Sequence, residues 1–342
     1  YYAHWTPDIG TSYSVKLNCN GGNFADGSSD VKNYAYGTGV VLPTLTRIGY
    51  TFEGWYDNAG FNGNPIKEIT ATDTGNKEFW AKWTAIPAVA PTINTQPKDL
   101  SFKYGESRTL AVVAESAASE DYMLEYQWYV NTTSSNTNGR LIPEATNNTY
   151  DIPNNAQVGT YYYYCIVTAK RNDNNGVATA TSGIAKVEIT KLAGPAAPNG
   201  LNPVAPSEMG QADGKITGVN GTMEYAVKVD ADNWNACQGD EIAGLKAGTY
   251  YVRVKATDTH EAGAVATVIV PYGDNIVKSI TVSDDGYKRE YYTGDGLDLT
   301  GLKITVTRSD KTTETIPVTK EMVLGFDSST ASEQTLTITY EG

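Results

Sequence analysis

The chain of 342 residues carries 39 acidic and 26 basic side chains, a formal net charge of −13. An acidic chain without a basic face cannot displace the counterions of a nucleic acid, so we expect no nucleic acid partner. No apolar stretch is long enough to span a bilayer, and we expect no membrane insertion in this segment. Tyrosine (24) outnumbers phenylalanine (6), glycine reaches 33 and helical patterns are absent. This composition favours a mainly β fold divided into several small domains.

The chain opens on an internal repeat. Residues 1–6 read YYAHWT and residues 79–84 read FWAKWT, so the aromatic, Ala, Trp and Thr positions match. A fixed offset between similar stretches indicates tandem repeats. We therefore expect residues 1–6 to be the tail of a preceding repeat and residues 7–85 to be a complete copy.

The complete copy contains an alternating strand, SYSVKLNCN, a Gly21-Gly22 turn and the block YGTGVVLPTLTRIGYTFEGWYD. Strand periodicity predicts a compact core from its aromatic residues, with Trp55 and Trp83 as structural core residues beside Tyr50, Phe52 and Tyr56. In order and content the segment resembles the internalin-type B repeat, also called the Listeria-Bacteroides repeat. The resemblance implies a β-grasp-like fold that occurs in tandem on bacterial surface proteins.

A proline-rich linker, AIPAVAPTINTQP, marks the next boundary, and we expect a second domain over residues 86–191. Its runs EYQWYV, GTYYYYCIVTA and IAKVEIT resemble an immunoglobulin-like (Ig-like) sandwich. By that resemblance Trp128 takes the place of the buried strand-C tryptophan, and Tyr163 stands two residues before Cys165 as a tyrosine-corner residue does. In the immunoglobulin fold a first cysteine on an earlier strand forms a disulfide with the cysteine after the tyrosine corner. In this chain the corresponding strand reads LAVVA over residues 110–114, so no disulfide is expected there.

Two further domains are expected, over residues 192–273 and 274–342. The first alternates in GTYYVRV and resembles a fibronectin III-like (Fn3-like) or Ig-like sandwich. The second resembles a bacterial Ig-like domain through YYTGDGLDLTGLKITVTRSD and GFDSSTASEQTLTITY. That family continues through one more strand, so we expect an incomplete sandwich whose unpaired edge either joins a neighbouring chain or frays. The complete expectation is an elongated tandem array of one β-grasp-like B repeat and three β-sandwiches.

Candidate chemistry is sparse, and we expect no catalytic residue, metal site or cofactor. The two histidines, His4 and His260, and the three cysteines, Cys19, Cys165 and Cys237, lie in separate domains without partners at ligand spacing. One acidic turn begins like a calcium loop, with Asp230, Asp232 and Glu241 at its positions 1, 3 and 12. Trp234 and Asn235 occupy positions that need an oxygen ligand and a glycine, so an ordinary polar turn is the better interpretation.

Two functional hypotheses from different classes stay open. The first is a non-catalytic stalk or adhesion segment of a bacterial protein, secreted or at the cell surface, whose export signal and anchor lie outside this segment. The second is a set of ancillary modules of a large secreted enzyme, one of which binds glycan through an exposed row in YYYYC or TYYVRV. Alternation predicts that half of these tyrosines point into the core. We expect the chain to be monomeric. Its expected partner is a protein or a glycan on the surface of a host or in the environment.

Overall fold

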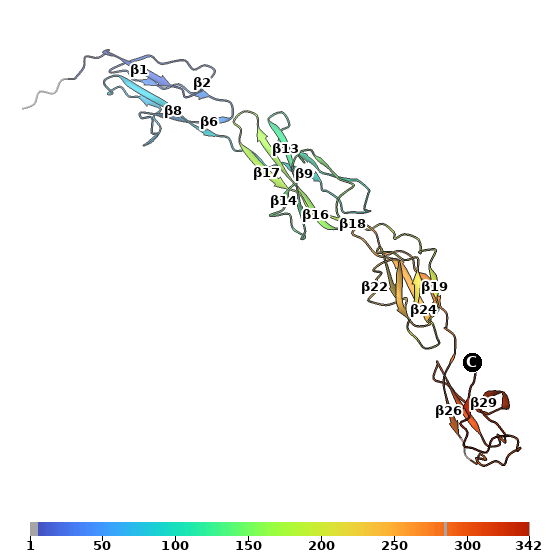
Figure 1. The fold of residues 1–342 in the computed structure, drawn as a ribbon. Helices are drawn as coiled ribbons and strands as arrows, with labels where there is room; N and C mark the ends of the chain where they lie inside the picture. The colour runs from blue at the N-terminus through green and yellow to red at the C-terminus, as the bar shows by residue number, and fades with distance from the viewer. Residues whose placement is uncertain (1–5, 284–285, 342) are drawn as a thin grey trace, which may run out of the picture. The chain divides into compact units, whose positions relative to one another are not determined.

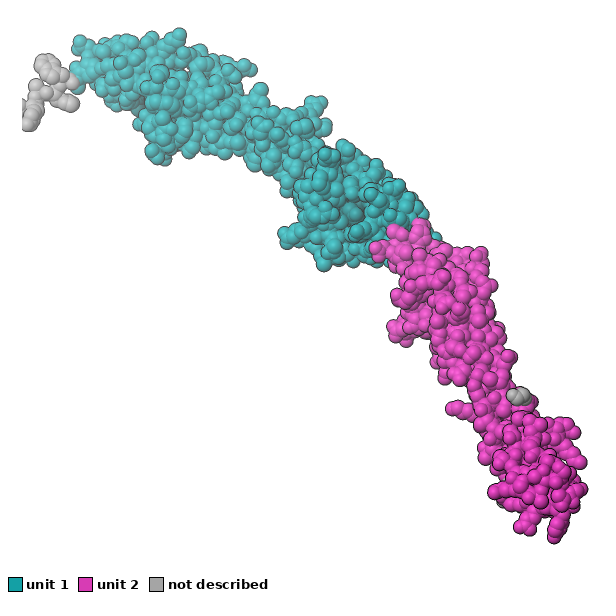
Figure 2. Space-filling view, viewed as in Figure 1, with its two compact units in different colours: residues 1–190 teal, residues 191–342 magenta. Residues whose placement is uncertain are grey.

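In the computed structural model, residues 6–283 and 286–341 are described. They form β-strands connected by turns, and the described residues contain no regular helix besides the short 3-10 helix Lys320–Met322 (Figure 1). The chain forms two compact units, one up to Thr190 and one from Lys191 onward (Figure 2). The preceding-repeat prediction falls on residues 1–6, of which 1–5 lie outside the described residues.

Buried hydrophobic side chains gather in four separate clusters. Residues 13–83 supply the first, 93–189 the second, 201–270 the third and 277–340 the fourth, and we call these stretches the first to fourth segments. Each cluster draws on its own segment alone. The first two segments belong to the first unit, and the last two belong to the second unit.

The first segment is built on a four-stranded sheet in the order β3-β1-β8-β6. Its central pair, β1 and β8, is parallel, and the outer pairs are antiparallel. The strands are β1 (Ser12–Asn18), β3 (Asn33–Ala35), β6 (Tyr50–Tyr56) and β8 (Lys77–Ala85). Two short ladders complete the segment: β2 (Asn23–Phe24) with β5 (Leu45–Thr46), and β4 (Val40–Val41) with β7 (Glu68–Ile69).

A bulge in β6 brings Phe52 and Trp55, three residues apart, to the same core. The register with β8 shifts between Phe52 and Gly54, which displaces the alternation that the sequence suggested. Trp55 therefore points into the first core, where its indole N–H donates to Pro43 O at 2.7 Å. Tyr56 is buried on the other face, in an edge-to-face contact with Phe61 at a ring distance of 5.7 Å.

The Gly21-Gly22 turn has two different physical requirements. Gly21 adopts φ +85°, a conformation that glycine reaches without strain. Gly22 lies against the Trp83 ring, because a Cβ built there would stand 2.2 Å from Trp83 Cζ2. The Trp83 indole N–H in turn donates to Cys19 O at 3.0 Å.

Replacing Gly22 with alanine is therefore expected to push Trp83 away from the turn. Overpacking of this kind costs about 1–3 kcal/mol, and we expect the free energy of unfolding of the first segment to fall by that amount. Hydrogen exchange of β1 and β8 peptides under increasing denaturant would measure it. Gly221→Ala, at a position with open space around a built Cβ, is the control, and equal effects of the two variants would contradict the prediction.

The second segment is dominated by a six-stranded sheet. Its order is β10-β18-β16-β13-β14, with β17 also paired to β16. The strands are β10 (Leu100–Lys103), β13 (Tyr122–Asn131), β14 (Arg140–Leu141), β16 (Gly159–Arg171), β17 (Val177–Thr181) and β18 (Ala185–Thr190). The opposing layer contains two antiparallel pairs: β9 (Thr92–Thr95) with β12 (Val113–Glu115), and β11 (Arg108–Ala111) with β15 (Thr149–Ile152).

The third segment has two sheets. One has the order β19-β20-β23, and the other has the order β22-β21-β24-β25. The strands are β19 (Asn202–Val204), β20 (Gly214–Thr217), β21 (Met223–Ala226), β22 (Asn235–Ala236), β23 (Glu241–Leu245), β24 (Gly248–Val254) and β25 (Ala266–Val270).

The fourth segment contains a three-stranded sheet, β26 (Val277–Ser283), β27 (Lys303–Arg308) and β28 (Thr313–Pro317), and the pair β29 (Val323–Leu324) and β30 (Thr337–Ile338). Within the described residues, β26 pairs only with β27 and β30 only with β29. The unpaired edge expected from the sequence stays a prediction. The third and fourth segments touch where Lys278 Nζ donates to Glu208 Oε1 at 2.5 Å, and Met209 N–H donates to the carbonyl oxygen of the connecting residue Asp274 at 2.8 Å.

Candidate functional site

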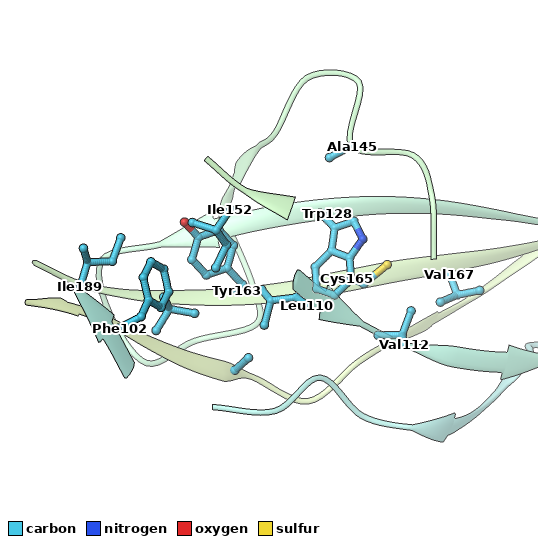
Figure 3. Packing of buried hydrophobic residues seen from close by; sticks show 12 residues of the cluster. Phe102, Leu110, Val112, Trp128, Ala145, Ile152, Tyr163, Cys165, Val167 and Ile189 are labelled. Atoms are coloured by element: carbon cyan, nitrogen blue, oxygen red, sulfur yellow. The ribbon is translucent and has the colours of Figure 1, made fainter. Parts of the chain in front are cut away.

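The four side chains expected to form structural cores lie in the first and second segments. Trp55 (2% exposed), Trp128 (0%) and Tyr163 (6%) are buried, whereas Trp83 is partly buried and packs against the first core. In the second core Trp128 lies opposite Cys165 across the β13 and β16 pair, with Leu110 and Val112 from the facing layer in the same cluster (Figure 3). Apolar side chains therefore fill the position where a disulfide partner would otherwise stand.

All three cysteines are free thiols. Burial raises the pKa of the Cys165 thiol to about 11, and burial also raises the pKa of Cys237. The thiolate is the nucleophilic form of cysteine, so a raised pKa together with burial slows the reaction of Cys165 and Cys237 near neutral pH. Their chemistry is that of small apolar side chains in a core.

We therefore expect Cys165 and Cys237 of the folded chain to resist a thiol reagent at pH 8, while the partly exposed Cys19 reacts first. Denaturant should release all three for reaction. With a disulfide reagent that releases a coloured thiolate on reaction, absorbance would give the reaction rate. Mass spectrometry of peptides would then show which cysteine has reacted. Modification of Cys165 as fast as that of Cys19 in the folded chain would contradict this expectation.

The four consecutive tyrosines of β16 do not form an exposed row. Tyr163 lies in the core as alternation predicts, and burial raises its pKa to about 12. Tyr164 lies on the opposite face of the strand and is nevertheless buried, with only 2% of it exposed. Its ring stacks on Tyr129 at 5.2 Å, and its hydroxyl accepts the N–H of Gly139 at 3.0 Å. The loop between β13 and β14 covers this ring, which removes it from any glycan-stacking surface.

An aromatic and charged cluster lies in the sheet of the third segment that contains β24. The Arg253 guanidinium stands 3.8 Å from the centroid of the Trp234 ring, and its Nε donates to Glu224 Oε1 at 2.7 Å. The Trp234 indole N–H donates to Ala231 O at 3.1 Å. Trp234 is one of the two residues that depart from the calcium-loop pattern, and its ring instead stacks against the Arg253 guanidinium.

The second unit also holds a cavity of about 780 Å³ in the fourth segment. Apolar side chains of the fourth core, Leu302 and Ile338, contribute to its lining. Four aromatic residues also line it: Tyr287, Tyr291, Tyr292 and Phe326. Three acidic residues stand among the remaining lining residues: Glu290, Asp327 and Glu333. The usual small-ligand site of this size has a mainly apolar lining, whereas polar and charged side chains make up half of the residues that line this cavity.

The carboxylate of Asp327 accepts hydrogen bonds from residues of the same turn. It accepts the N–H and hydroxyl of Ser329 and the hydroxyl of Thr330, and these hydrogen bonds lower its pKa from 3.8 to about 2. An acid that is ionised at all ordinary pH values cannot act as a proton donor. Asp298 and Asp310, whose pKa values are lowered by hydrogen bonds from Thr300 and Thr312, follow the same pattern.

A pH titration tests this assignment. Because the folded pKa lies below the unfolded one, the stabilisation by Asp327 is complete above about pH 4 and disappears as the pH falls through 2. We expect the carboxyl carbon of Asp327 to titrate near pH 2 in an NMR experiment, with the amide signals of Ser329 and Thr330 moving at the same midpoint. Asp327→Asn should abolish that movement. A midpoint near 3.8 would show that the turn does not hold the carboxylate.

Metal-ligating side chains are not clustered in the described residues. No three His, Cys, Asp or Glu side chains there form a cluster suited to a metal ion. His260 Nδ1 lies 2.9 Å from Thr259 Oγ1, its neighbour in the chain, and His4 lies outside the described residues. No helix in the described part of the chain has the length and apolar character needed to cross a bilayer.

Comparison with known families supports both resemblances that the sequence suggested at the two ends of the chain. Residues 13–82 match the Listeria-Bacteroides repeat domain, and residues 286–342 match the bacterial Ig-like domain of group 3. Domains of these kinds are typical of extracellular, non-catalytic segments of bacterial proteins. No curated protein is significantly similar in sequence to the chain.

Solved structures similar to the chain include Ig and Fn3 modules. The fibronectin(III)-like modules of Clostridium thermocellum CbhA are 17% identical, with 53% of this chain and 94% of that chain covered and a TM-score of 0.21. The N-terminal eight Ig domains of Down Syndrome Cell Adhesion Molecule are 12% identical, with 88% and 47% covered and a TM-score of 0.31. Sidekick-1 immunoglobulin domains 1–5 are 13% identical, with 88% and 66% covered and a TM-score of 0.26.

Proposed function

We propose that this chain is a non-catalytic spacer within a bacterial surface protein, whose work is to hold a distal binding domain away from the cell. The observation that carries the proposal is the presence of four hydrophobic cores, each drawn from one contiguous stretch of sequence. A chain built in this way gains length with each added core and needs no shared site. The families matched by the first and fourth segments support a location outside the cell.

A replacement experiment in the parent protein tests the proposal. Deleting residues 7–341 should leave export of the distal domain intact while reducing its capture of a ligand immobilised on beads. Inserting unrelated β-sandwich domains of similar total length should restore capture, because a spacer contributes distance and not specific contacts. If unrelated domains fail and only the original segment restores capture, the segment binds something itself and the spacer proposal is wrong.

A second function, glycan binding by ancillary modules of a secreted enzyme, is favoured by one observation. The cavity of the fourth segment is lined by aromatic rings beside acidic side chains, a combination that suits sugar rings and their hydroxyl groups. A glycan array with the intact chain tests it, with Tyr291→Ala and Phe326→Ala as cavity variants. Binding that both variants lose would support this function, and the absence of binding to any glycan would remove its support.

A further inference from the structure

The turn between β16 and β17, residues 171–176, reaches from the second segment to the first within the same compact unit. Asn174 Nδ2 donates to Gly49 O and to Ile86 O, each at 2.8 Å. Its Oδ1 accepts the N–H of Gly176 at 2.8 Å. Both amide hydrogens of the side chain are thus used on carbonyls outside the second segment, and its oxygen fixes the orientation of the amide from within.

The turn itself is held rigidly by the second segment. Arg171 forms a two-pronged ion pair with Asp173, at 2.9 Å from Nε and 2.6 Å from Nη2, and these side chains are only 12% and 18% exposed. Arg171 Nη1 also donates to the Tyr122 hydroxyl at 3.2 Å. Paired Arg–carboxylate hydrogen bonds of this kind fix geometry as well as adding energy. Asn174 is therefore presented by a preorganised loop.

The linker between the segments is held at two points. Ile86 O accepts from Asn174, and Val89 N–H donates to the Tyr122 hydroxyl at 3.1 Å. Ile86 N–H donates to Gly49 O at 2.9 Å, which attaches the start of the linker to the first segment. The hydrogen bonds of residues 86–89 thus continue from one segment to the next, across the stretch where the proline content predicted a domain boundary.

The receiving surface on the first segment requires a glycine. Gly49 adopts φ +80°, and a Cβ built on it would stand 2.8 Å from Asp173 Cγ and 3.0 Å from Asn174 Cβ. A side chain here would both strain the backbone and push the turn of the second segment away. The carbonyl of Gly49 thus accepts the Asn174 amide, and the absence of a side chain on Gly49 leaves room for Asn174 to approach that carbonyl.

We propose that Asn174 locks the first and second segments into one rigid body, so that residues 85–91 do not act as a hinge. The lock depends on an amide that donates twice: alanine removes both hydrogen bonds, and aspartate would place a carboxylate against two carbonyl oxygens. The inference concerns the joint alone and stands whether the chain is a spacer or binds glycan.

Residual dipolar couplings of the full deuterated chain test the lock. In the unsubstituted chain, we expect the couplings of the first and second segments to fit one common alignment tensor. Asn174→Ala and Asn174→Asp should each cause the loss of that common tensor, while the couplings within each segment still fit its own coordinates. Gly49→Ala, a substitution on the first segment, should also cause the loss of the common tensor.

Asn172→Ala is the matched control. Asn172 lies in the same turn, but its side-chain amide donates to Glu120 O at 3.0 Å within the second segment. This variant should therefore retain the common tensor. Two independent tensors in the unsubstituted chain would overturn the proposal, as would a common tensor that survives Asn174→Ala or Gly49→Ala.

Discussion

Replacing Trp128 with alanine is expected to destabilise the second segment by about 3–5 kcal/mol, the usual cost of deleting a buried tryptophan side chain. Trp128 is fully buried opposite Cys165, and its indole N–H donates to Asn147 O at 2.9 Å. The substitution removes the ring and leaves that carbonyl without its partner. Because small domains are stable by only about 5–15 kcal/mol, a large share of the segment's stability is lost.

Hydrogen exchange with peptide resolution is the suitable measurement for a chain with several cores. Peptides of β13 and β16 should lose protection in Trp128→Ala, while those of β24 and β27 stay protected, because the third and fourth cores contain no residue of the second. Met123→Ala, a half-exposed position of the same strand, is the control and should stay within about 1 kcal/mol of the unsubstituted chain. Uniform loss of protection across all four segments would show one cooperative core instead of four.

Trp55→Ala is expected to have an effect of similar size, about 3–5 kcal/mol, on the first segment. Trp55 is 2% exposed, and its indole N–H donates to the carbonyl of Pro43 across the core at 2.7 Å. Trp55→Phe should recover part of the loss, because it restores most of the apolar volume but not the hydrogen bond.

Trp80→Ala serves as the control for Trp55, since Trp80 is only partly buried and lies on the neighbouring strand β8, one residue from the position paired with Trp55. Denaturant titration followed by exchange of β1 and β8 peptides would rank the variants. We expect the order Trp55→Ala, then Trp55→Phe, then Trp80→Ala from most to least destabilised. A larger loss for Trp80→Ala than for Trp55→Ala would mean that the first core is organised around the other face of the sheet.

Tyr163 and Tyr250 are buried on the core faces of their strands, in agreement with the rule that a strand places every second side chain on the same face. The same rule does not account for Tyr56 and Tyr164. Tyr56 points to the face opposite Trp55 and is buried there because Phe61 packs edge-to-face against its ring. Tyr164 is buried because the loop before β14 folds across the outer face of the sheet and places Gly139 against its ring.

The sequence by itself determined the four hydrophobic stretches, their β character and the family resemblance of the first and fourth, because strand periodicity, turn glycines and linker prolines are local properties of the chain. Only the tertiary structure decided that Asn174 meets Gly49, 125 residues away, that Gly22 leaves room for Trp83, and that an aromatic cavity opens in the fourth segment. These contacts depend on where distant loops come together in space, and a polar turn residue such as Asn174 has the same local pattern whether its amide faces water or a neighbouring carbonyl.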